Sequence, residues 1–380
     1  MIPKILAATR KGLFTLERNG PRQSPWRVTG TNFLADNVSL VLADPYSHRI
    51  YAALDHGHFG VKLHRTDDRG LEFAEIPAPA YPPKPDDANE KDMWGNPIPW
   101  STVRIWGLET GGPKQHGHLW CGTLPGGLFH SDDYGNSWQL VESLWRHPKR
   151  LEWMGGGADL PGLHSICVDP RDPRVIRCGV SSGGVWVTRD SGATWTNEGT
   201  GMWQDHAPEG LEHNPNGQDV HRLVQCPGAP DRLWVQHHNG IFVSSDSAQT
   251  WQEAKDVKPS SFGFAVVVHP RDPDTAWFIP GIKDEQRIPV DGQLIVTRTR
   301  DGGKTFETLA NGLPREPAYD VVYRHGFDVS RSGNDLAFGS TTGGLWVSDD
   351  QGDSWVSAHV RLPPVYAVKF LEAPIGVRLQ

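Results

Sequence analysis

Apolar residues occur in short runs along the whole chain, and turn residues separate these runs. Four runs of the same form end in proline: VLADP (41–45), ICVDP (166–170), LVQCP (223–227) and VVVHP (266–270). Short runs rich in β-branched residues and bounded by turns are typical of strands. The pattern therefore predicts a chain built almost entirely from short β-strands.

A hairpin follows the apolar strand in each repeat. Gly-rich turns between β-branched and aromatic residues mark it at CGTLPGGLFHS (121–131), CGVSSGGVWVT (178–188), VQHHNGIFVS (235–244) and FGSTTGGLWVS (338–348). Segments of this kind indicate a strand, a turn and a second strand. Each repeat thus supplies an apolar strand and a hairpin, and a fourth strand follows the next turn.

That next turn has the form S/T-x-D-x-G-x-S/T-W/F, and it occurs six times, at 66–73, 131–138, 188–195, 244–251, 299–306 and 348–355. The first copy has Glu72 in place of Ser or Thr, and the fourth has Ala248 in place of Gly. We expect the Asp to accept hydrogen bonds from its own turn, the Gly to adopt a positive φ, and the aromatic residue to pack between sheets. All three roles are structural, so these aspartates are not expected to be catalytic.

Four strands per repeat indicate the blades of a β-propeller. The hairpin occurs seven times, because ILAATRKGLFTL (5–16) is a further copy whose degenerate turn ends at Trp26. This copy lacks an innermost strand, and VYAVKFL (365–371) is an innermost strand without a hairpin. Pairing between the two ends would complete a blade and remove a free sheet edge.

The expected fold is therefore all-β: one domain over 1–380, a seven-bladed β-propeller with four antiparallel strands per blade, closed by the N- and C-terminal strands. Six blades is the alternative if the two ends do not pair. The expected blades are 365–380 with 1–27, 36–74, 101–140, 162–198, 219–253, 262–308 and 320–357.

Composition restricts the partners and the location. The net charge of the 380-residue chain is −8, which argues against nucleic-acid binding through clustered Lys and Arg. No apolar run reaches roughly 18 residues, so no membrane span is expected. The start of the chain, MIPKILAATRKG, lacks the features of a signal peptide. The four cysteines form no C-x-x-C pair and are expected to be buried thiols in the cytoplasm.

Long loops connect several blades, and function usually resides in such loops. They cover roughly 74–100, 139–163 and 196–220 between blades and 280–293 within one. Five tryptophans lie in the first three: Trp94, Trp100, Trp145, Trp153 and Trp203. They would either stack on a sugar or grip a peptide, or they would pack the loops onto the propeller.

Aligning the innermost strands on their Pro turns places His164, His221, Ser39 and Phe264 at one position, six residues before the proline. Looser alignment adds Arg104, Arg324 and Tyr366. We expect His164, His221 and Tyr366 to be catalytic. The expected ligand-binding residues are Arg104, Arg324, His56, His58, His237, His238, Asp219 and Asp320. Imidazoles and guanidiniums together suit an anionic ligand such as a carboxylate or phosphate; the alternative is a polar, water-filled channel.

A divalent metal ion is a further option. His206, Glu209, Glu212, His213, Asp219 and His221 lie close together in the sequence, near His237 and His238. None of these pairs has a dedicated spacing such as H-E-x-x-H. No residue is therefore assigned as a metal ligand.

The six turn motifs make the chain similar to the BNR/Asp-box superfamily, which includes sialidases, sortilin-type receptors, photosystem-II assembly factors, xyloglucan-active hydrolases and some polysaccharide lyases. Longer stretches resemble a bacterial family labelled sialidase-like or glycosyl hydrolase, whose activity is not established. These stretches are AALDHGHFGVKLHRTDD (52–68), LPGLHSICVDPRDP (160–173), GQDVHRLV (217–224) and FGSTTGGLWVSDD (338–350).

QRIP (286–289) resembles part of a sialidase arginine motif, but it lies in the sixth repeat, so sialidase activity is not expected.

Two classes of function fit these observations. The first class is an enzyme that acts on a carbohydrate or a small anionic molecule by hydrolysis or elimination. The second is a non-catalytic propeller that binds a protein partner, as assembly factors do. The ionisable residues of the innermost strands favour the first.

Overall fold

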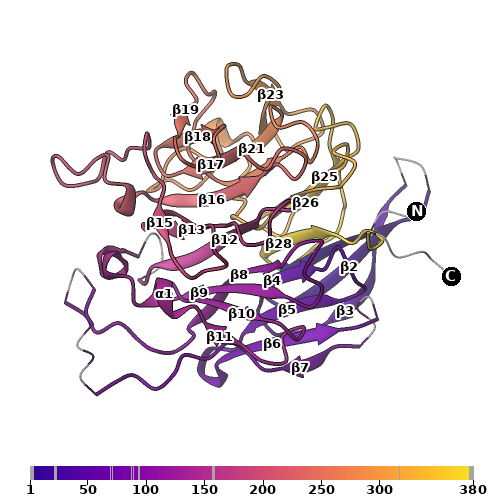
Figure 1. The fold of residues 1–380 in the computed structure, drawn as a ribbon. Coiled ribbons are helices and arrows are strands. Elements are labelled where there is room, and N and C mark those ends of the chain that lie inside the picture. The colour runs from indigo at the N-terminus through magenta and orange to yellow at the C-terminus, as the bar shows by residue number, and fades with distance from the viewer. Residues whose placement is uncertain are drawn as a thin grey trace. The chain divides into compact units, whose positions relative to one another are not determined.

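The computed structural model describes residues 4–20, 24–68, 70, 72–86, 88, 90–92, 95–155, 159–315 and 317–375. The fold is a seven-bladed β-propeller with four antiparallel strands per blade (Figure 1). Helical structure in the described ranges is limited to α1 (Glu142–Trp145) and the 3-10 turns η1 (Gly57–Phe59), η2 (Pro148–Glu152), η3 (Pro215–Gly217) and η4 (Val290–Gly292). None of these helices has the length and apolar character of a transmembrane segment.

The strands of each blade follow one another in the sequence, with one exception at the chain ends. The first three blades are β28 (Val365–Phe370) with β1 (Lys4–Thr9), β2 (Gly12–Arg18) and β3 (Trp26–Asn32); β4 (Val38–Ala43), β5 (Ile50–Asp55), β6 (Val61–Thr66) and β7 (Ala74–Ile76); and β8 (Arg104–Thr110), β9 (Leu119–Leu124), β10 (Leu128–Ser131) and β11 (Gln139–Leu140). 

The remaining four blades have the same order. They are β12 (Gly162–Val168), β13 (Ile176–Ser181), β14 (Gly184–Thr188) and β15 (Thr196–Asn197); β16 (Val220–Gln225), β17 (Leu233–His237), β18 (Gly240–Ser244) and β19 (Gln252–Glu253); β20 (Gly263–Val268), β21 (Ala276–Pro280), β22 (Val296–Thr299) and β23 (Glu307–Leu309); and β24 (Phe327–Val329), β25 (Leu336–Gly339), β26 (Leu345–Ser348) and β27 (Val356–Ser357).

The two ends of the chain complete one blade. Strand β28 pairs antiparallel with β1, with Ala7 opposite Val368 and Leu6 opposite Lys369. The expected closure and the count of seven blades are therefore confirmed, and the six-bladed alternative is wrong. The four cysteines are buried and unpaired, as expected.

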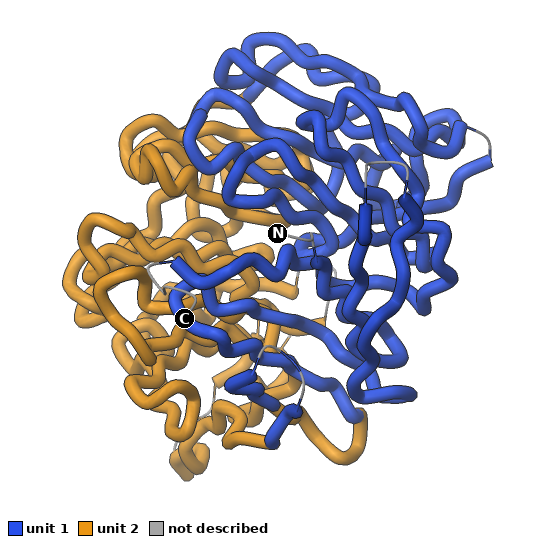
Figure 2. Tube along the Cα trace, turned by 90° about the vertical axis from the view of Figure 1, so that its right-hand side faces the viewer, with its two compact units in different colours: residues 1–56, 64–74, 254–380 blue, residues 57–63, 75–253 orange. Residues whose placement is uncertain are grey.

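Two compact units divide the chain (Figure 2). One contains 1–56, 64–74 and 254–380, and the other contains 57–63 and 75–253. Within the first, residues of β20–β23 and β24–β27 share a core that includes Trp277, Phe338 and Trp355. Within the second, residues of β8–β11 and β12–β15 share another, which includes Trp195. The motif aromatics Trp195 and Trp355 thus pack between adjacent sheets, as expected.

Each turn aspartate caps its own turn. Asp133 Oδ1 accepts from the backbone N–H of Ser137 (2.8 Å) and from Ser131 Oγ (2.8 Å), and its Oδ2 accepts from Ser137 Oγ (2.7 Å). The corresponding hydrogen bonds from Thr194 to Asp190 lower the pKa of that carboxyl to about 2. Carboxylates that are hydrogen-bonded in this way keep their charge and hold the turn closed. They are structural groups, as the sequence motif predicts.

One innermost strand uses an imidazole where others use a carboxylate. After β4, Asp44 accepts from the backbone N–H of Tyr46 (2.8 Å). At the same place after β20, His269 Nδ1 accepts from the backbone N–H groups of Arg271 (3.1 Å) and Asp272 (2.9 Å). This arrangement needs an unprotonated Nδ1. Burial lowers the pKa of His269 below its ordinary value of 6.5, and the effect of Asp272 opposes this.

Substituting His269→Asp should therefore make the protein less sensitive to acid. Below pH 6.5 the unfolded chain binds a proton at His269 more readily than the folded chain does, so the free energy of unfolding falls as the pH falls. Aspartate can accept the same hydrogen bonds and stays ionised to lower pH. Between pH 7 and pH 5 the free energy of unfolding should fall by roughly 1 kcal/mol more in the native chain than in the variant. This is about the net contribution of one such hydrogen bond. Urea unfolding at both pH values measures this difference.

The exposed His359 provides the control for that comparison. The variant His359→Asn should show the same pH dependence as the native chain. An acid response in His269→Asp equal to that of the native chain would contradict the capping role of this histidine.

Candidate functional site

Several innermost strands contain one extra residue at the same place. Breaks in the pairing register put it at Ser39 in β4, Trp106 in β8, His164 in β12, His221 in β16 and Tyr366 in β28. A bulge of this kind bends the strand and re-aims a side chain, and bulges are frequent next to functional sites. The blades thus present one residue each from an equivalent position.

The alignment on the Pro turns found this position in three of these strands, at Ser39, His164 and His221, and the looser alignment found Tyr366. It is wrong for β8, where Trp106 and not Arg104 is the bulged residue. Pro113 lies seven residues after Trp106, whereas Pro170 lies six after His164, so the constant distance to the Pro turn does not hold in β8. Arg104 is partly exposed and begins β8, opposite Leu124.

Asp219 is the centre of a group of ionisable side chains at the start of β16. Its side chain is 7% exposed, and Oδ1 accepts from the backbone N–H of Ser182 (3.2 Å) and from Ser181 Oγ (3.4 Å). Its Oδ2 lies 3.4 Å from His238 Nδ1 and 3.6 Å from His221 Nε2. One oxygen is thus fixed by the adjacent blade, and the other faces two imidazoles.

The hairpin explains why these residues meet. Val220 pairs with His237, so the start of β16 lies beside the end of β17. The backbone N–H of His238 also donates to the Asp219 carbonyl (3.0 Å). The bulge at His221 then allows both Asp219 and His221 to lie near His238.

The loop before β16 adds two further groups. The rings of His206 and His238 are 4.7 Å apart, and His206 Nδ1 lies 3.5 Å from Asp205 Oδ1. A hydrogen bond with the Asn239 side chain, aided by His206, lowers the pKa of Asp205. We call Asp205, His206, Asp219, His221 and His238 the His–Asp cluster. His238 is its link, since its ring is also 5.5 Å from that of His221.

The cluster offers two sets of potential metal ligands among the residues that the structure describes. Asp219, His221 and His238 form one, and Asp205, His206 and His238 form the other; in each set the ligand atoms lie within 4.8 Å of one another. The sequence pointed to His206, Asp219 and His221 here. It missed Asp205, whose only signal was its position directly before His206.

His237 is buried behind the cluster. Its Nδ1 accepts from the backbone N–H of Asn239 (3.1 Å), and its ring packs edge-on against Phe242 at 5.2 Å. Burial is the main cause that lowers its pKa to about 3. His237 is therefore a neutral, structural residue at neutral pH.

His164 is also fully buried, with a relative exposure of 0%. Its Nε2 donates to the Val220 carbonyl (2.7 Å), and its Nδ1 is hydrogen-bonded to Ser165 Oγ (2.8 Å). Its ring packs edge-on against Trp106. The Nε2 bond joins β12 to β16, the Nδ1 bond lies within β12, and both ring nitrogens are thus occupied, which argues against a role for His164 in proton transfer.

The other predicted residues lie on separate elements and have their own partners. His56 Nε2 is 3.9 Å from Asp36 Oδ2. Asp320 accepts from Ser340 Oγ (2.5 Å) and from Thr342 Oγ1. Tyr366 on β28 is partly exposed, and His58 in η1 is exposed. Arg324 is buried, and its guanidinium lies 5.5 Å from the centre of the Phe264 ring.

Four of the five loop tryptophans pack against the protein. Trp145 and Trp153 are 1% exposed. Trp153 Nε1 donates to Asn216 Oδ1 (2.9 Å), and Trp203 Nε1 donates to Glu253 Oε2 (2.8 Å). Trp100 Nε1 donates to a glutamate in the same way. The packing alternative is thus confirmed for these four, while Trp94 lies outside the described residues.

The substitution Trp153→Ala should lower the free energy of unfolding by about 3–5 kcal/mol, the usual cost of removing a buried aromatic side chain. Trp153→Phe keeps much of the apolar contact with Trp186 and loses the hydrogen bond to Asn216, so its loss should be smaller. Urea unfolding of both variants measures the two losses. An alanine variant as stable as the native chain would show that Trp153 does not anchor its loop.

No protein-family model matches the chain. The oligoxyloglucan-reducing-end-specific xyloglucanase of Emericella nidulans is 33% identical over 218 residues, which span 55% of this chain and only 24% of that enzyme. The GH74 xyloglucanase from Xanthomonas campestris superposes with a TM-score of 0.61 at 17% identity, over 93% of this chain and 52% of that chain. YCF48 bound to a D1 peptide superposes with a TM-score of 0.51 at 14% identity, over 85% and 81%. These two structural likenesses show a shared fold.

Proposed function

We propose that this protein acts on a carbohydrate and that the His–Asp cluster carries out the proton transfers. The observation that carries the proposal is Asp219, a buried carboxylate with one oxygen fixed by Ser181 and Ser182 and the other facing His221 and His238. The match to the Emericella nidulans xyloglucanase supports a sugar substrate. The six turn motifs support membership of the Asp-box group.

Cleavage of a sugar chain needs a group that takes a proton and a group that gives one. His238 is suited to this exchange, because its side chain is 22% exposed whereas that of His221 is 3% exposed. Asp219 would orient His238 and stabilise its charged form, as carboxylates do for catalytic histidines. His206, on the loop and 40% exposed, would be the second imidazole in contact with the substrate.

Of the remaining predicted residues, Arg104 belongs to the same compact unit as the His–Asp cluster and would bind a sugar carboxylate. Arg324 and Tyr366 belong to the other compact unit and form no part of this proposal. His164 is left out, because both of its ring nitrogens are occupied. Hydrolysis of a neutral sugar and elimination from an acidic one both need this chemistry.

A divalent metal ion is the alternative way in which the same cluster would act. Imidazole nitrogens with a carboxylate oxygen form the ligand sets of open catalytic metal sites. Asp219, His221 and His238 would hold the ion, which would polarise a substrate oxygen. Activity that is lost with a chelator and restored with Zn²⁺ or Mn²⁺ would identify this mode.

The assay compares substrates and variants. Xyloglucan oligosaccharides, other neutral glycans and uronate-containing glycans are tested for new reducing ends and for unsaturated products. His238→Ala and Asp219→Asn should each lower kcat/KM roughly 100-fold or more on the substrate that is turned over. The exposed-residue variant His359→Asn should match the native chain. Native rates in both cluster variants would exclude the cluster from the reaction.

A second candidate is a non-catalytic propeller that binds a protein. The observation that favours it is the fold shared with YCF48, a chain solved with a bound D1 peptide. A pull-down from the source cells would then recover one partner in stoichiometric amount, and none of the glycans would be turned over.

A further inference from the structure

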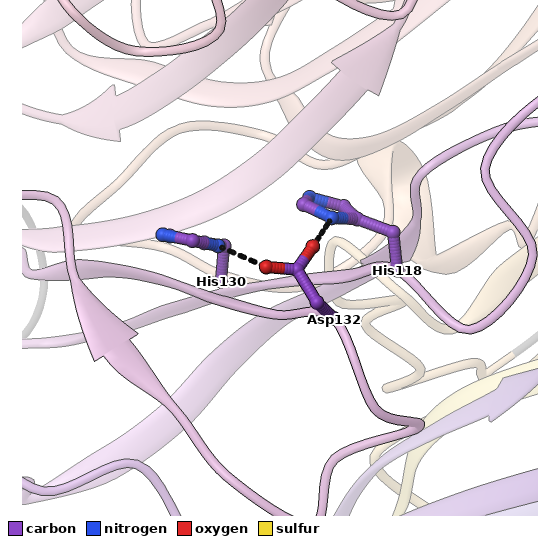
Figure 3. A group of neighbouring side chains, drawn as sticks. All are labelled: His118, His130 and Asp132. Atoms are coloured by element: carbon purple, nitrogen blue, oxygen red, sulfur yellow. Dashed lines mark hydrogen bonds and ion pairs between the residues drawn. The ribbon is translucent and has the colours of Figure 1, made fainter.

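Three side chains of the blade β8–β11 meet beside a turn, away from the His–Asp cluster. His118 precedes β9, His130 lies in β10, and Asp132 follows β10. Figure 3 shows the two imidazoles facing the two oxygens of one carboxylate. His118 Nδ1 donates to Asp132 Oδ1 at 2.6 Å, and His130 Nδ1 lies 3.8 Å from Asp132 Oδ2.

The strand register brings these residues together. His130 pairs with Trp120 and Ser131 pairs with Leu119, so His118 and Asp132 follow as the next opposite positions. His130 and Asp132 are two residues apart and therefore point to the same side of the hairpin. The two imidazoles lie almost parallel, with ring centres 5.6 Å apart and an angle of 16°. The arrangement depends on paired strands and not on a long loop.

The same three positions in the blade β4–β7 carry Arg49, Arg65 and Asp67. There Arg49 Nε lies 2.6 Å and Arg65 Nε 3.4 Å from Asp67 Oδ1. The two guanidiniums neutralise the carboxylate permanently and have no lone pair to give to a metal. The blade β8–β11 replaces both with imidazoles, which do have one.

His130 Nδ1 is the second observation that points to a ligand. This atom is buried and has no hydrogen-bond partner in the described structure, although it faces the carboxylate of Asp132. A buried polar nitrogen without a partner is uncommon and calls for an explanation. A cation between the imidazoles and the carboxylate would satisfy it.

We propose that His118, His130 and Asp132 bind one divalent transition-metal ion, with Zn²⁺ as the probe of choice. The ligand atoms already lie within 4.8 Å of one another. Two imidazole nitrogens and a carboxylate oxygen are ligands typical of zinc, and they favour Zn²⁺ and Cu²⁺ over Mg²⁺ and Ca²⁺. The Asp132 side chain is 66% exposed, so the ion has access and keeps a position for water. Metal binding through His118 Nδ1 would replace its hydrogen bond to Asp132 and place the ring proton on Nε2.

This metal site is separate from the His–Asp cluster, on which the proposed function depends. It lies where β9 begins and β10 ends, whereas the His–Asp cluster lies where β16 begins and β17 ends, which is the opposite end of a blade. An ion at His118 is therefore not available to chemistry at His238. Loss of this ion should leave turnover at the His–Asp cluster unchanged.

The test is a titration of the chelator-treated full chain with Zn²⁺ by calorimetry. In the native chain we expect a site that is lost, or weakened roughly tenfold or more, in His130→Ala and in Asp132→Asn. Asp67→Asn is the matched control, because it removes the same carboxylate from the arginine-bearing blade, and it should bind as the native chain does. A double variant, His221→Ala with His238→Ala, should retain the site.

A second variant guards against loss of folding. His118→Arg with His130→Arg recreates the ligand-free set of the blade β4–β7, which this fold already accommodates, so it should fold with an unchanged circular dichroism spectrum and fail to bind. Zn²⁺ should raise the Tm of the native chain and of Asp67→Asn but not of this variant. An unchanged number of bound Zn²⁺ ions in the double-arginine variant would overturn the proposal.

Discussion

A four-stranded sheet of this size cannot bury its apolar faces alone, and this constraint governs the rest of the structure. Within each compact unit the sheets share cores, and the motif tryptophans occupy the space between them. The same constraint explains the chain ends. Without β28, the sheet that begins with β1 would lack its innermost strand and expose an edge. Pairing of β28 with β1 therefore joins the two ends of the sequence in one blade.

The sequence predicted this part well, because strands, turns and closure depend on local patterns. It also predicted the bulge positions of His164 and His221, since a Pro turn at constant distance fixes the register, and a looser alignment found Tyr366. Burial was harder to predict. His164 Nε2 donates a hydrogen bond to the carbonyl of Val220, which is far away in the sequence. The buried Trp153 likewise donates its indole N–H to the distant Asn216. Contacts of this kind depend on how blades and loops pack.

The candidate site also combines contacts that follow from local sequence patterns with contacts that depend on how a loop packs. The hairpin register accounts for Asp219 beside His238, and this pair was among the predicted residues. The approach of His206 and Asp205 depends on the path of the loop before β16, which no repeat pattern determines. The geometry selects His238 as the exposed member and His237 as the buried one, although the two are adjacent and chemically identical. His237 is the last residue of β17 and is paired on both sides, with Val220 and Gly240, whereas His238 begins the turn after the strand.

In a repeat protein, a residue that departs from the repeat is a natural candidate for function, yet two departures here have different consequences. His269 stands where Asp44 stands in another blade, and its Nδ1 accepts two backbone N–H groups, so the imidazole only replaces a turn cap. His130 stands where Arg65 stands, and its buried Nδ1 accepts nothing from the described chain. The substitution alone does not distinguish the two cases. What distinguishes them is whether the backbone already uses the lone pair, because only an unused lone pair is available to a ligand.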